Sequence, residues 1–342
     1  MPAMLPRSCG VVHAEAVVVR CRPDMAIGKP LPWDVVMEPI YLRRDLEALG
    51  WTHTTIRRAE RRGELHRIRR GAWSRGPAGS AREEHMALAR GALPYCAPDT
   101  LMSHVTAAAF WGLPLPPVDL SRVWLTREGA GGGHVRADVH VVRAPLPETH
   151  RALVDGVPVT ALARTVNDVA RFVPFHGGVM VADAALAQGL TRDDLLEANR
   201  TAHRWPGNAR ARNVALFADP RAESPYESWV RVLLWEMGLP EAVPQFRITD
   251  DQGREVARVD FAIPELRMVI EYDGEGKYGE LLEPGLTPQQ AFAAEKTREA
   301  AIRERGWWVV RLTQTDVHDA RRFRARMQQA VRMARQYAAR AA

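Results

Sequence analysis

The sequence predicts an α/β protein with several domains. Three observations lead to this fold class: two helical patterns and a hairpin near the N-terminus, mixed helical and strand patterns in the middle, and helix, three strands, helix, strand and helix after Glu223. The 342 residues are enough for two or three domains, and 46% hydrophobic and 26% charged residues are ordinary for a soluble globular protein. The expected segments are 1–36 (disordered extension), 37–80 (helix-turn-helix), 81–202 (α+β), 203–222 (linker) and 223–342 (α/β, a mixed sheet flanked by helices).

The first 36 residues and the cysteines indicate where the protein works. The extension contains prolines and basic residues but no long apolar region, so it does not fit a secretory signal, and no later apolar run is long enough to cross a membrane. Cys9, Cys21 and Cys96 lack CxxC spacing and support neither a disulfide framework nor a structural zinc site. We therefore expect a cytoplasmic protein without a membrane partner.

Positive charge is concentrated near the N-terminus. Ten arginines and four acidic residues lie between Tyr41 and Arg75, so this segment has an excess of 10 − 4 = +6, equal to the formal net charge of the whole chain. A concentration of this kind is typical of a protein that binds a polyanion.

The same segment predicts a helix-turn-helix followed by a hairpin. Gly50 ends a first helix, Thr52 caps a second that runs to Arg62, and LHRIRRGAWSR turns at Gly71 like the wing of a winged helix. The residues expected to contact double-stranded DNA are Thr54, Arg57, Arg58 and Arg61 in the major groove, and Arg67, Arg69 and Arg70 at phosphates. The alternative is a solvated basic face that binds no nucleic acid.

MEPIYLRRDLEALGWTHTTIRRAERRGELHRIRRGAWSRG resembles the N-terminal winged-helix domain of AbiEi-type antitoxins and transcriptional regulators of type IV toxin–antitoxin systems. SHVTAAAFWGLPL (103–115) and VDGVPVTALARTVNDVAR (154–171) resemble the domain that follows in that family. The resemblance implies a DNA-binding regulator without implying catalysis, and it makes a cognate toxin a candidate partner.

The middle segment shows structure and little chemistry. Helical periodicity is present at 83–92, 100–111, 162–172 and 179–188, and VWLTRE and ADVHVVRA alternate like strands on either side of GAGGGH. His104 follows Ser103 and precedes Thr106, which suggests half of a catalytic pair, but no partner is visible in the sequence. A capping or core histidine is the preferred interpretation.

The C-terminal segment brings carboxylates together. Glu271 and Asp273 have the same parity and share a face at the end of their strand, while Asp260 lies on the neighbouring strand. Glu227, in the first turn of the helix that Ser224 caps, is a fourth candidate. Clustered carboxylates repel one another unless a cation neutralises them, so we expect a Mg²⁺ site formed by Asp260, Glu271 and Asp273. Such a metal supports phosphodiester hydrolysis.

Lysine is rare in this chain, and two of its three lysines lie near these acids. Of 47 basic residues only Lys29, Lys277 and Lys296 are lysines. A lysine pKa falls in a crowded or buried site, whereas arginine stays protonated. Lys277 and Lys296 are therefore candidates for transferring a proton or stabilising charge on phosphate.

VDFAIPELRMVIEYDG is similar to the PD-(D/E)XK, restriction-endonuclease-like superfamily, especially the branch related to very-short-patch-repair endonucleases. The similarity covers 223–317 and implies that Asp260 is the central metal ligand, Glu271 the second carboxylate and Glu227 the helix acid. The family pattern places lysine two residues after Glu271, where this chain has Asp273. Three alternatives follow for the role of the family lysine. Lys277 or Lys296 performs it, metal and water perform it without a lysine, or the role is missing from this chain.

These residues also have ordinary structural interpretations. In these, Asp273 and Gly274 would form a turn, Glu271 would pair with Arg258 or Arg267 across strands, and Lys277 would lie in a solvated loop. The sequence thus predicts a DNA-binding protein with a Mg²⁺-dependent endonuclease domain. The alternatives are a non-catalytic transcriptional regulator with a degenerate nuclease fold, and an antitoxin that binds its toxin through the middle domain.

Overall fold

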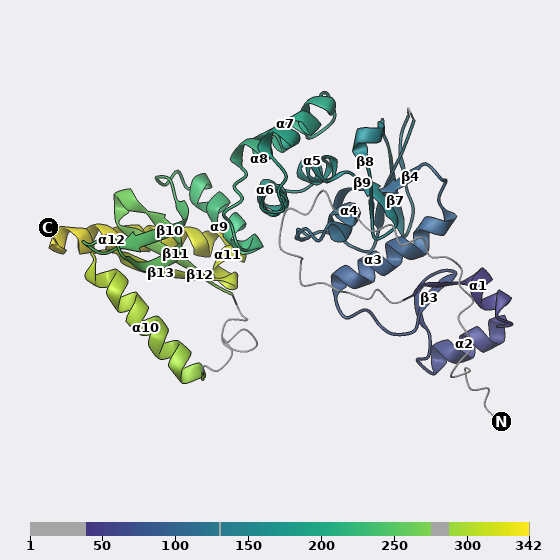
Figure 1. Cartoon of the computed structure of the whole chain (residues 1–342), viewed down its shortest axis with the longest axis horizontal. Coiled ribbons are helices and arrows are strands. Elements are labelled where there is room, and N and C mark those ends of the chain that lie inside the picture. Colours follow the sequence, from purple (N-terminus) through teal and green to yellow (C-terminus); the bar gives the residue numbers. More distant parts are fainter. Residues whose placement is uncertain (1–38, 130, 275–286, 342) are drawn as a thin grey trace. The chain divides into compact units, whose positions relative to one another are not determined.

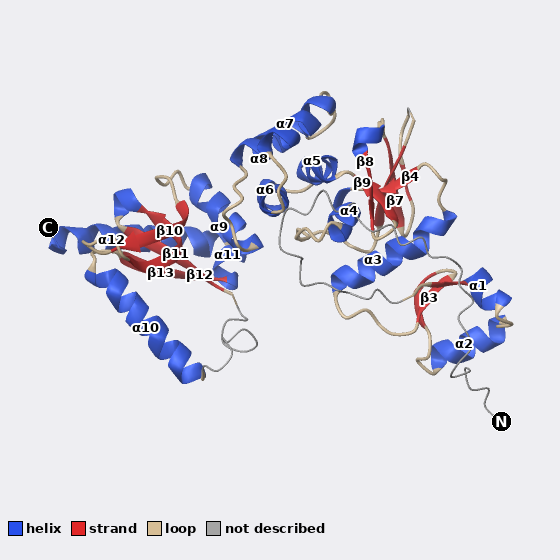
Figure 2. Ribbon diagram, viewed as in Figure 1, coloured by secondary structure: helices blue, strands red, loops and turns tan. Residues whose placement is uncertain are grey.

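The protein is a mixed α/β structure with three β-sheets (Figures 1 and 2). The computed structural model describes residues 39–129, 131–274 and 287–341, so the expected extension 1–36 lies outside the described residues. Contacts divide the chain into two compact units. Of the described residues, the first unit contains those up to Met102 and those of 123–161, and the second contains 103–122 and those from Leu162 onward.

The first unit begins with two helices and a hairpin around a small core. Its elements are β1 (Tyr41–Leu42), α1 (Arg43–Ala48), α2 (His53–Arg61), β2 (His66–Arg69) and β3 (Ala72–Ser74), and the strands form an antiparallel sheet in the order β1-β3-β2. Thr52 caps α2 by accepting a hydrogen bond from the Thr55 amide, and Gly71, at φ +85°, turns the chain between β2 and β3. Leu46, Ile56 and Trp73 are buried between these elements. The second helix and the hairpin lie where the sequence predicts them, whereas the expected start of the first helix, including Leu42, is the short strand β1.

A six-stranded sheet completes the first unit. Its elements are α3 (Ala81–Ala92), a 3₁₀ turn (Leu93–Tyr95), β4 (Thr100–Met102), β5 (Val123–Arg127), β6 (His134–Val135), β7 (Val139–Arg143), a 3₁₀ turn (Glu148–His150), β8 (Arg151–Val154) and β9 (Val157–Thr160). The strand order is β6-β7-β5-β4-β9-β8, and the β5–β7 and β4–β9 pairs are parallel. The helix predicted over 100–111 is wrong at its start, because Thr100–Met102 pairs with two strands and is fully buried. A short apolar run does not distinguish a buried strand from a buried helix.

Five helices form the first part of the second unit. They are α4 (His104–Phe110), α5 (Leu162–Phe172), α6 (Phe175–Ala187), α7 (Arg192–Thr201) and α8 (Asn208–Phe217). Helix α6 starts four residues before the predicted 179. Helix α8 lies inside the predicted linker 203–222 and buries Ala211, Val214 and Ala215, so that segment is packed.

Two clusters of buried ion pairs involve these helices, one within α5 and one that joins α6 to the helix containing Arg231. Asp168 of α5 is 0% exposed and accepts hydrogen bonds from Arg164 at 2.7 Å and Arg171 at 2.9 Å. Asp183 of α6 receives Arg231, a residue of the next helix along the chain, at 2.8 Å. Charges this deeply buried are tolerated only when they are paired and hydrogen-bonded. The Asp183–Arg231 pair therefore fixes the packing of two helices, whereas the Asp168 pairs lie within α5.

The C-terminal part contains a mixed four-stranded sheet. Its elements are α9 (Pro225–Glu236), β10 (Val243–Thr249), β11 (Glu255–Ile263), a 3₁₀ turn (Pro264–Leu266), β12 (Met268–Asp273), α10 (Pro288–Glu304), β13 (Trp308–Thr313), α11 (Gln314–His318) and α12 (Ala320–Ala341). The order is β10-β11-β12-β13, with the first three strands antiparallel and β13 parallel to β12. The predicted three-strand meander is confirmed.

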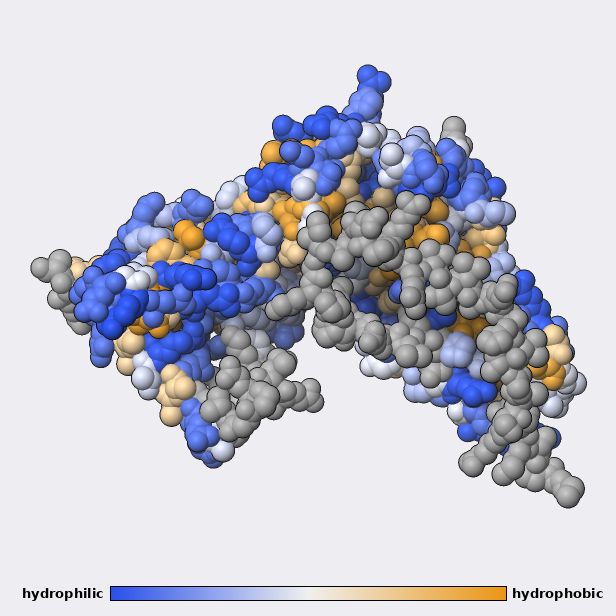
Figure 3. Space-filling model, viewed as in Figure 1, coloured by the Kyte–Doolittle hydropathy of each residue, from blue (hydrophilic) through white to orange (hydrophobic). Residues whose placement is uncertain are grey.

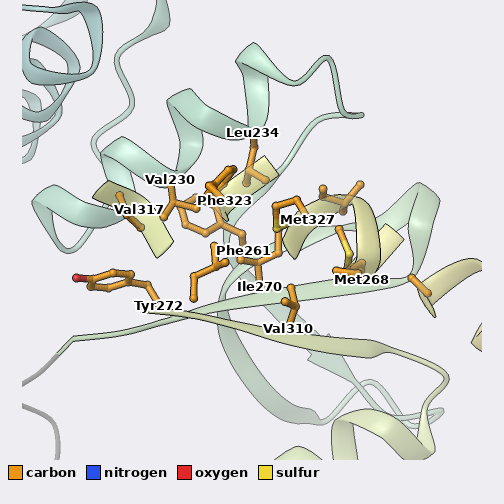
Figure 4. Close-up of a cluster of buried hydrophobic side chains, with 14 residues drawn as sticks. Val230, Leu234, Phe261, Met268, Ile270, Tyr272, Val310, Val317, Phe323 and Met327 are labelled. Carbon is orange, nitrogen blue, oxygen red and sulfur yellow. The ribbon is translucent and has the colours of Figure 1, made fainter. Parts of the chain in front are cut away.

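Each face of this sheet has its own core. Phe261, Ile270 and Val310 face α9, α11 and α12, and Figure 4 shows them close to Val230 and Phe323. The opposite face buries a second apolar cluster that includes Val259, Val309 and Ile302 of α10. Helices on both faces therefore leave only the ends and edges of the sheet for polar chemistry.

Candidate functional site

Strand β11 changes face at Asp260. Val259 belongs to the cluster on the α10 side, whereas Phe261 belongs to the cluster on the α9 side. Residues two apart on a regular strand point to one face, so the strand is irregular between them. Gln245 lies at the matching position of β10 with φ at +53°, a conformation that non-glycine residues rarely adopt. The two strands thus distort together around Asp260.

The carboxylate of Asp260 is held against the neighbouring strand. One oxygen accepts a hydrogen bond from the Tyr272 amide at 2.7 Å. Because Phe261 pairs with Ile270, the next position along this ladder places Asp260 beside Glu271. The predicted approach of β11 and β12 at this point is therefore present in the structure.

Glu227 faces Asp260 from the start of α9. Ser224 caps the helix and holds the Glu227 amide, while the Glu227 carboxylate accepts hydrogen bonds from the Glu223 amide at 2.9 Å and the Gln245 side chain at 3.0 Å. Burial raises the pKa of Glu227, and the negative charge of Asp260 raises it further, against the lowering effect of these hydrogen bonds. Asp260 and Glu227 are therefore close enough to interact electrostatically. Gln245 has no signature in the sequence that would have marked it as a partner.

The raised pKa of Glu227 predicts a pH-dependent cost in stability. The folded protein binds a proton here more readily than the unfolded chain, so the free energy of unfolding decreases as pH rises from the ordinary glutamate value through the folded pKa. Glu227→Gln removes this cost. We expect the stability of the variant relative to wild type to increase between about pH 4 and about pH 7, by about 1.4 kcal/mol for each pKa unit.

Urea denaturation at both pH values measures the effect. Glu236→Gln, at the exposed end of the same helix, is the matched control because it removes the same charge away from Asp260. If the difference in the free energy of unfolding between wild type and Glu227→Gln is the same at both pH values, the raised pKa of Glu227 is contradicted.

Glu271 and Asp273 face α10 and are paired with arginines. Glu271 is 3% exposed and accepts a hydrogen bond from Arg298 of α10 at 3.2 Å. Asp273 pairs at 3.2 Å with Arg311 of β13, which also contacts Glu295 and Glu299. Glu271 thus pairs with Arg298 and not with Arg258, one of the two partners that the sequence suggested. Arg258 binds Glu223 at 2.7 Å instead.

The described residues do not assemble the expected metal site. Within 39–129, 131–274 and 287–341, no group of three or more His, Cys, Asp or Glu is arranged to hold a metal ion. Asp260 faces Glu227, while the charges of Glu271 and Asp273 are balanced by guanidinium groups. The predicted trio of Asp260, Glu271 and Asp273 therefore does not fit Mg²⁺ as a ready-made ligand set.

The two lysines lie differently with respect to the described structure. Lys277 lies outside the described residues. Lys296 is exposed on α10, two residues before Arg298. No pattern in the sequence marks Arg298 and Arg311 as countercharges. Their spacing from the acids along the chain gives no local signal, since both contacts depend on how α10 and β13 pack.

The N-terminal arginines gather on α2 and the hairpin. Ile56 and Ala59 bury one face of α2, while Thr54, Arg57, Arg58 and Arg61 are exposed. In the hairpin, Arg67 and Arg70 are exposed as well. These residues form an outward basic surface, which we call the α2 surface.

Arg69 differs from the other predicted phosphate contacts. It is half-buried, and its guanidinium donates to Asp138 at 2.9 Å and to the Gly91 carbonyl at 3.1 Å. It also lies over the Tyr95 ring. Arg69 thus ties the hairpin to α3 and to the start of β7, and its donors are engaged within the first unit.

His104 is a core residue. It is 5% exposed, and its Nδ1 lies 3.0 Å from the hydroxyl of Ser103, which is 0% exposed. Both side chains are removed from solvent, which agrees with the preferred structural interpretation.

Comparisons with known proteins identify similar mycobacterial chains. No protein-family model matches the sequence. Two curated proteins of Mycobacterium tuberculosis, the uncharacterized proteins MT2308 (strain CDC 1551 / Oshkosh) and Rv2248 (strain H37Rv), are each 35% identical over 165 residues, or 48% of this chain. The matched region spans 58% of their length. The crystal structure of the RV2827C protein from the same organism is 15% identical, with a TM-score of 0.35, covering 62% of this chain and 83% of that chain.

Within the described ranges, no helix combines the length and apolar character needed to cross a membrane.

Proposed function

We propose that the protein binds double-stranded DNA through the α2 surface. The observation that supports this most strongly is the position of three exposed arginines, Arg57, Arg58 and Arg61, on a capped helix whose opposite face is buried. Two helices followed by a hairpin is the arrangement of a winged helix, in which the second helix enters the major groove. Arginine forms paired hydrogen bonds with guanine edges and with phosphates.

The hairpin extends the same surface. Arg67, on strand β2, and Arg70, in the turn, are exposed, and a wing contacts the phosphate backbone with residues of this kind. Arg69 is assigned a structural role, since Asp138 and the Gly91 carbonyl already occupy its donors. The proposed interface therefore excludes Arg69.

Salt dependence distinguishes DNA binding from a merely solvated basic face. We would measure binding of the full chain to a fluorescently labelled duplex by anisotropy over a range of salt concentrations. The logarithm of the association constant should fall linearly with the logarithm of salt, with a slope of about −0.9 for each phosphate neutralised. The five exposed arginines of the α2 surface alone give a slope of about −4.5. Absence of binding, or a slope near zero, would reject the proposal.

A second candidate function is metal-dependent hydrolysis of DNA by the C-terminal part, which has the helix and strand order of a restriction-endonuclease-like domain. It is favoured by the proximity of Glu227 to Asp260, because burial and then the charge of Asp260 raise the pKa of Glu227, and a cation bound there would relieve both costs. Mg²⁺ usually takes only one or two carboxylates, with water and substrate phosphate completing its shell. Asp260 and Glu227 are the residues that would hold it, with Glu271 nearby.

Asp260→Asn tests this second candidate. Asparagine retains an oxygen that accepts the Tyr272 amide hydrogen bond, so the fold at the strand distortion is preserved while the charge is lost. We expect wild type to nick supercoiled plasmid only with Mg²⁺, and the variant to bind DNA normally without nicking. If wild type does not nick, or the variant nicks equally well, the non-catalytic regulator is the remaining function. A cognate toxin then becomes the partner to look for, through rescue of growth in its presence.

A further inference from the structure

The last helix of the chain, α12, is basic along its whole length. Ala320–Ala341 contains 22 residues and no aspartate or glutamate. Its seven arginines are Arg321, Arg322, Arg324, Arg326, Arg332, Arg335 and Arg340. A helix without acidic residues has no charge balance of its own, so its field extends into the solvent.

One face of α12 is committed to the core. Phe323, Met327, Ala330 and Ala334 are each at most 4% exposed and pack beneath the sheet. Figure 4 shows Phe323 and Met327 pointing into this cluster. The helix is therefore fixed in place by burial of its apolar side.

Four arginines lie together on an exposed face of α12. At about 100° per residue, Arg321, Arg324, Arg332 and Arg335 fall within about 80° of one another, centred about 130° around the helix from the buried side. All four are exposed, and none has an ion-pair partner in the part of the chain that the structure describes. At 1.5 Å per residue the stripe runs for about 21 Å, roughly the axial length of six base pairs. We call this set the α12 stripe.

Neighbouring arginines behave differently. Arg322 binds Asp316 at 2.6 Å, and Arg326 lies 3.6 Å from Asp316 and donates to the Arg311 carbonyl. These two arginines fasten α12 to α11 and β13. Arg322 and Arg326 therefore have a structural role, whereas the side chains of the α12 stripe form no ion pair within the described structure.

The chemistry of this surface fits a nucleic-acid backbone better than a membrane. A helix that lies on a bilayer inserts its apolar face, but the apolar face of α12 is already buried in the protein. Met333, at 36%, is the one exposed large hydrophobic residue on the described part of α12. The face of the C-terminal part that is visible at the left in Figure 3 is largely hydrophilic.

We propose that the α12 stripe is a second DNA-binding surface that contacts the phosphate backbone of a duplex without reading its sequence. The linear array of guanidinium groups complements the regular spacing of phosphates along a strand. This inference extends the proposed DNA-binding function to the second compact unit, and it does not depend on the α2 surface.

The test is a full-length variant with Arg321→Gln, Arg324→Gln, Arg332→Gln and Arg335→Gln. Glutamine keeps good helix propensity, so circular dichroism and thermal unfolding should match wild type. In the anisotropy titration with a labelled duplex, the salt slope should become less steep by about 3.6, or about 0.9 for each lost contact. Binding at about 0.1 M salt should weaken on the order of a thousandfold.

A matched control removes four other exposed arginines of the same unit. Arg200, Arg221, Arg247 and Arg254 each pair with a nearby acid, so their replacement by glutamine lowers the net charge equally without touching the α12 stripe. The control should keep the wild-type slope. If the salt slope becomes less steep by the same amount in both variants, the effect comes from net charge alone and the proposal is overturned.

Two further outcomes separate this proposal from its alternatives. An unchanged slope in the α12 variant overturns it, even if variants of the α2 surface lose binding. If the α12 variant keeps its DNA slope but loses binding to vesicles of anionic phospholipid, the stripe is a membrane contact and the proposal is wrong. If the α12 variant loses its slope while α2 variants do not, the α12 proposal stands and the α2 function fails.

Discussion

A variant carrying Arg57→Gln, Arg58→Gln and Arg61→Gln should bind duplex DNA about a thousandfold more weakly than wild type. Each arginine contributes a charge-assisted hydrogen bond worth about 1.5 kcal/mol at the lower end of the usual range, and three such losses correspond to about this factor. The salt slope should become less steep by about 2.7 if all three contact phosphates, and by less if some contact base edges. Anisotropy titrations at several salt concentrations measure both quantities.

The control for this variant comes from the same unit. Arg43, Arg44 and Arg62 are also exposed, but each lies within 3.8 Å of an acidic side chain. Replacing these three by glutamine changes the net charge by the same amount and should leave most of the affinity intact. If both triple variants weaken binding equally, α2 has no special part in recognition.

Asp168→Ala should destabilise the second unit by about 3–5 kcal/mol, the range found when one partner of a buried ion pair is removed. Arg164 is 2% exposed and would lose the acceptor that lies 2.7 Å from its Nε, while Arg171 would lose its contact at 2.9 Å. Both guanidinium groups also lie over the Trp205 ring, which supplies an aromatic face but no carboxylate. The Nε of Arg171 would keep its hydrogen bond to the Pro206 carbonyl at 3.0 Å, but both guanidinium groups would lose the carboxylate that balances their charge.

Urea denaturation of Asp168→Ala against Glu197→Ala isolates the effect of burial. Glu197 pairs with Arg200 on α7, but both side chains are more than 60% exposed. Removing an exposed partner of this kind should cost less than about 1 kcal/mol. Similar losses in the two variants would show that the buried cluster contributes nothing beyond an ordinary surface pair.

Local chemistry explains which elements the sequence predicts well. Thr52 caps α2 and Gly71 turns the hairpin through interactions within a few residues, so both are readable from the chain. The strand β4 is missed because its identity depends on pairing with β5 and β9, which lie more than twenty residues away. The segment 203–222 has the proline and glycine content of a linker with room for one helix, and packing against α5, α6 and α7 holds α8 there.

The candidate site shows the same division. Strand alternation correctly places Glu271 and Asp273 on one face, where Arg311 reaches Asp273 from the neighbouring strand. The alternation of side chains along a strand does not predict the distortion at Asp260. Strand β11 changes face there beside Gln245 of β10, whose backbone has a positive φ. The alternation also does not predict which residue balances the charge of Glu271, because Arg298 lies on α10, many residues further along the chain.

The pairing of Asp183 with Arg231 limits how this polypeptide can be cut for experiments. A fragment beginning at Glu223, where the sequence suggests a boundary, would contain the guanidinium of α9 and leave its carboxylate on the discarded side. It would also uncover the surface of α9 that packs on α6. Such a fragment should aggregate or unfold, whereas one that retains the preceding helices keeps the pair intact. Attempts to measure nuclease activity on the isolated C-terminal piece would then report on a damaged protein.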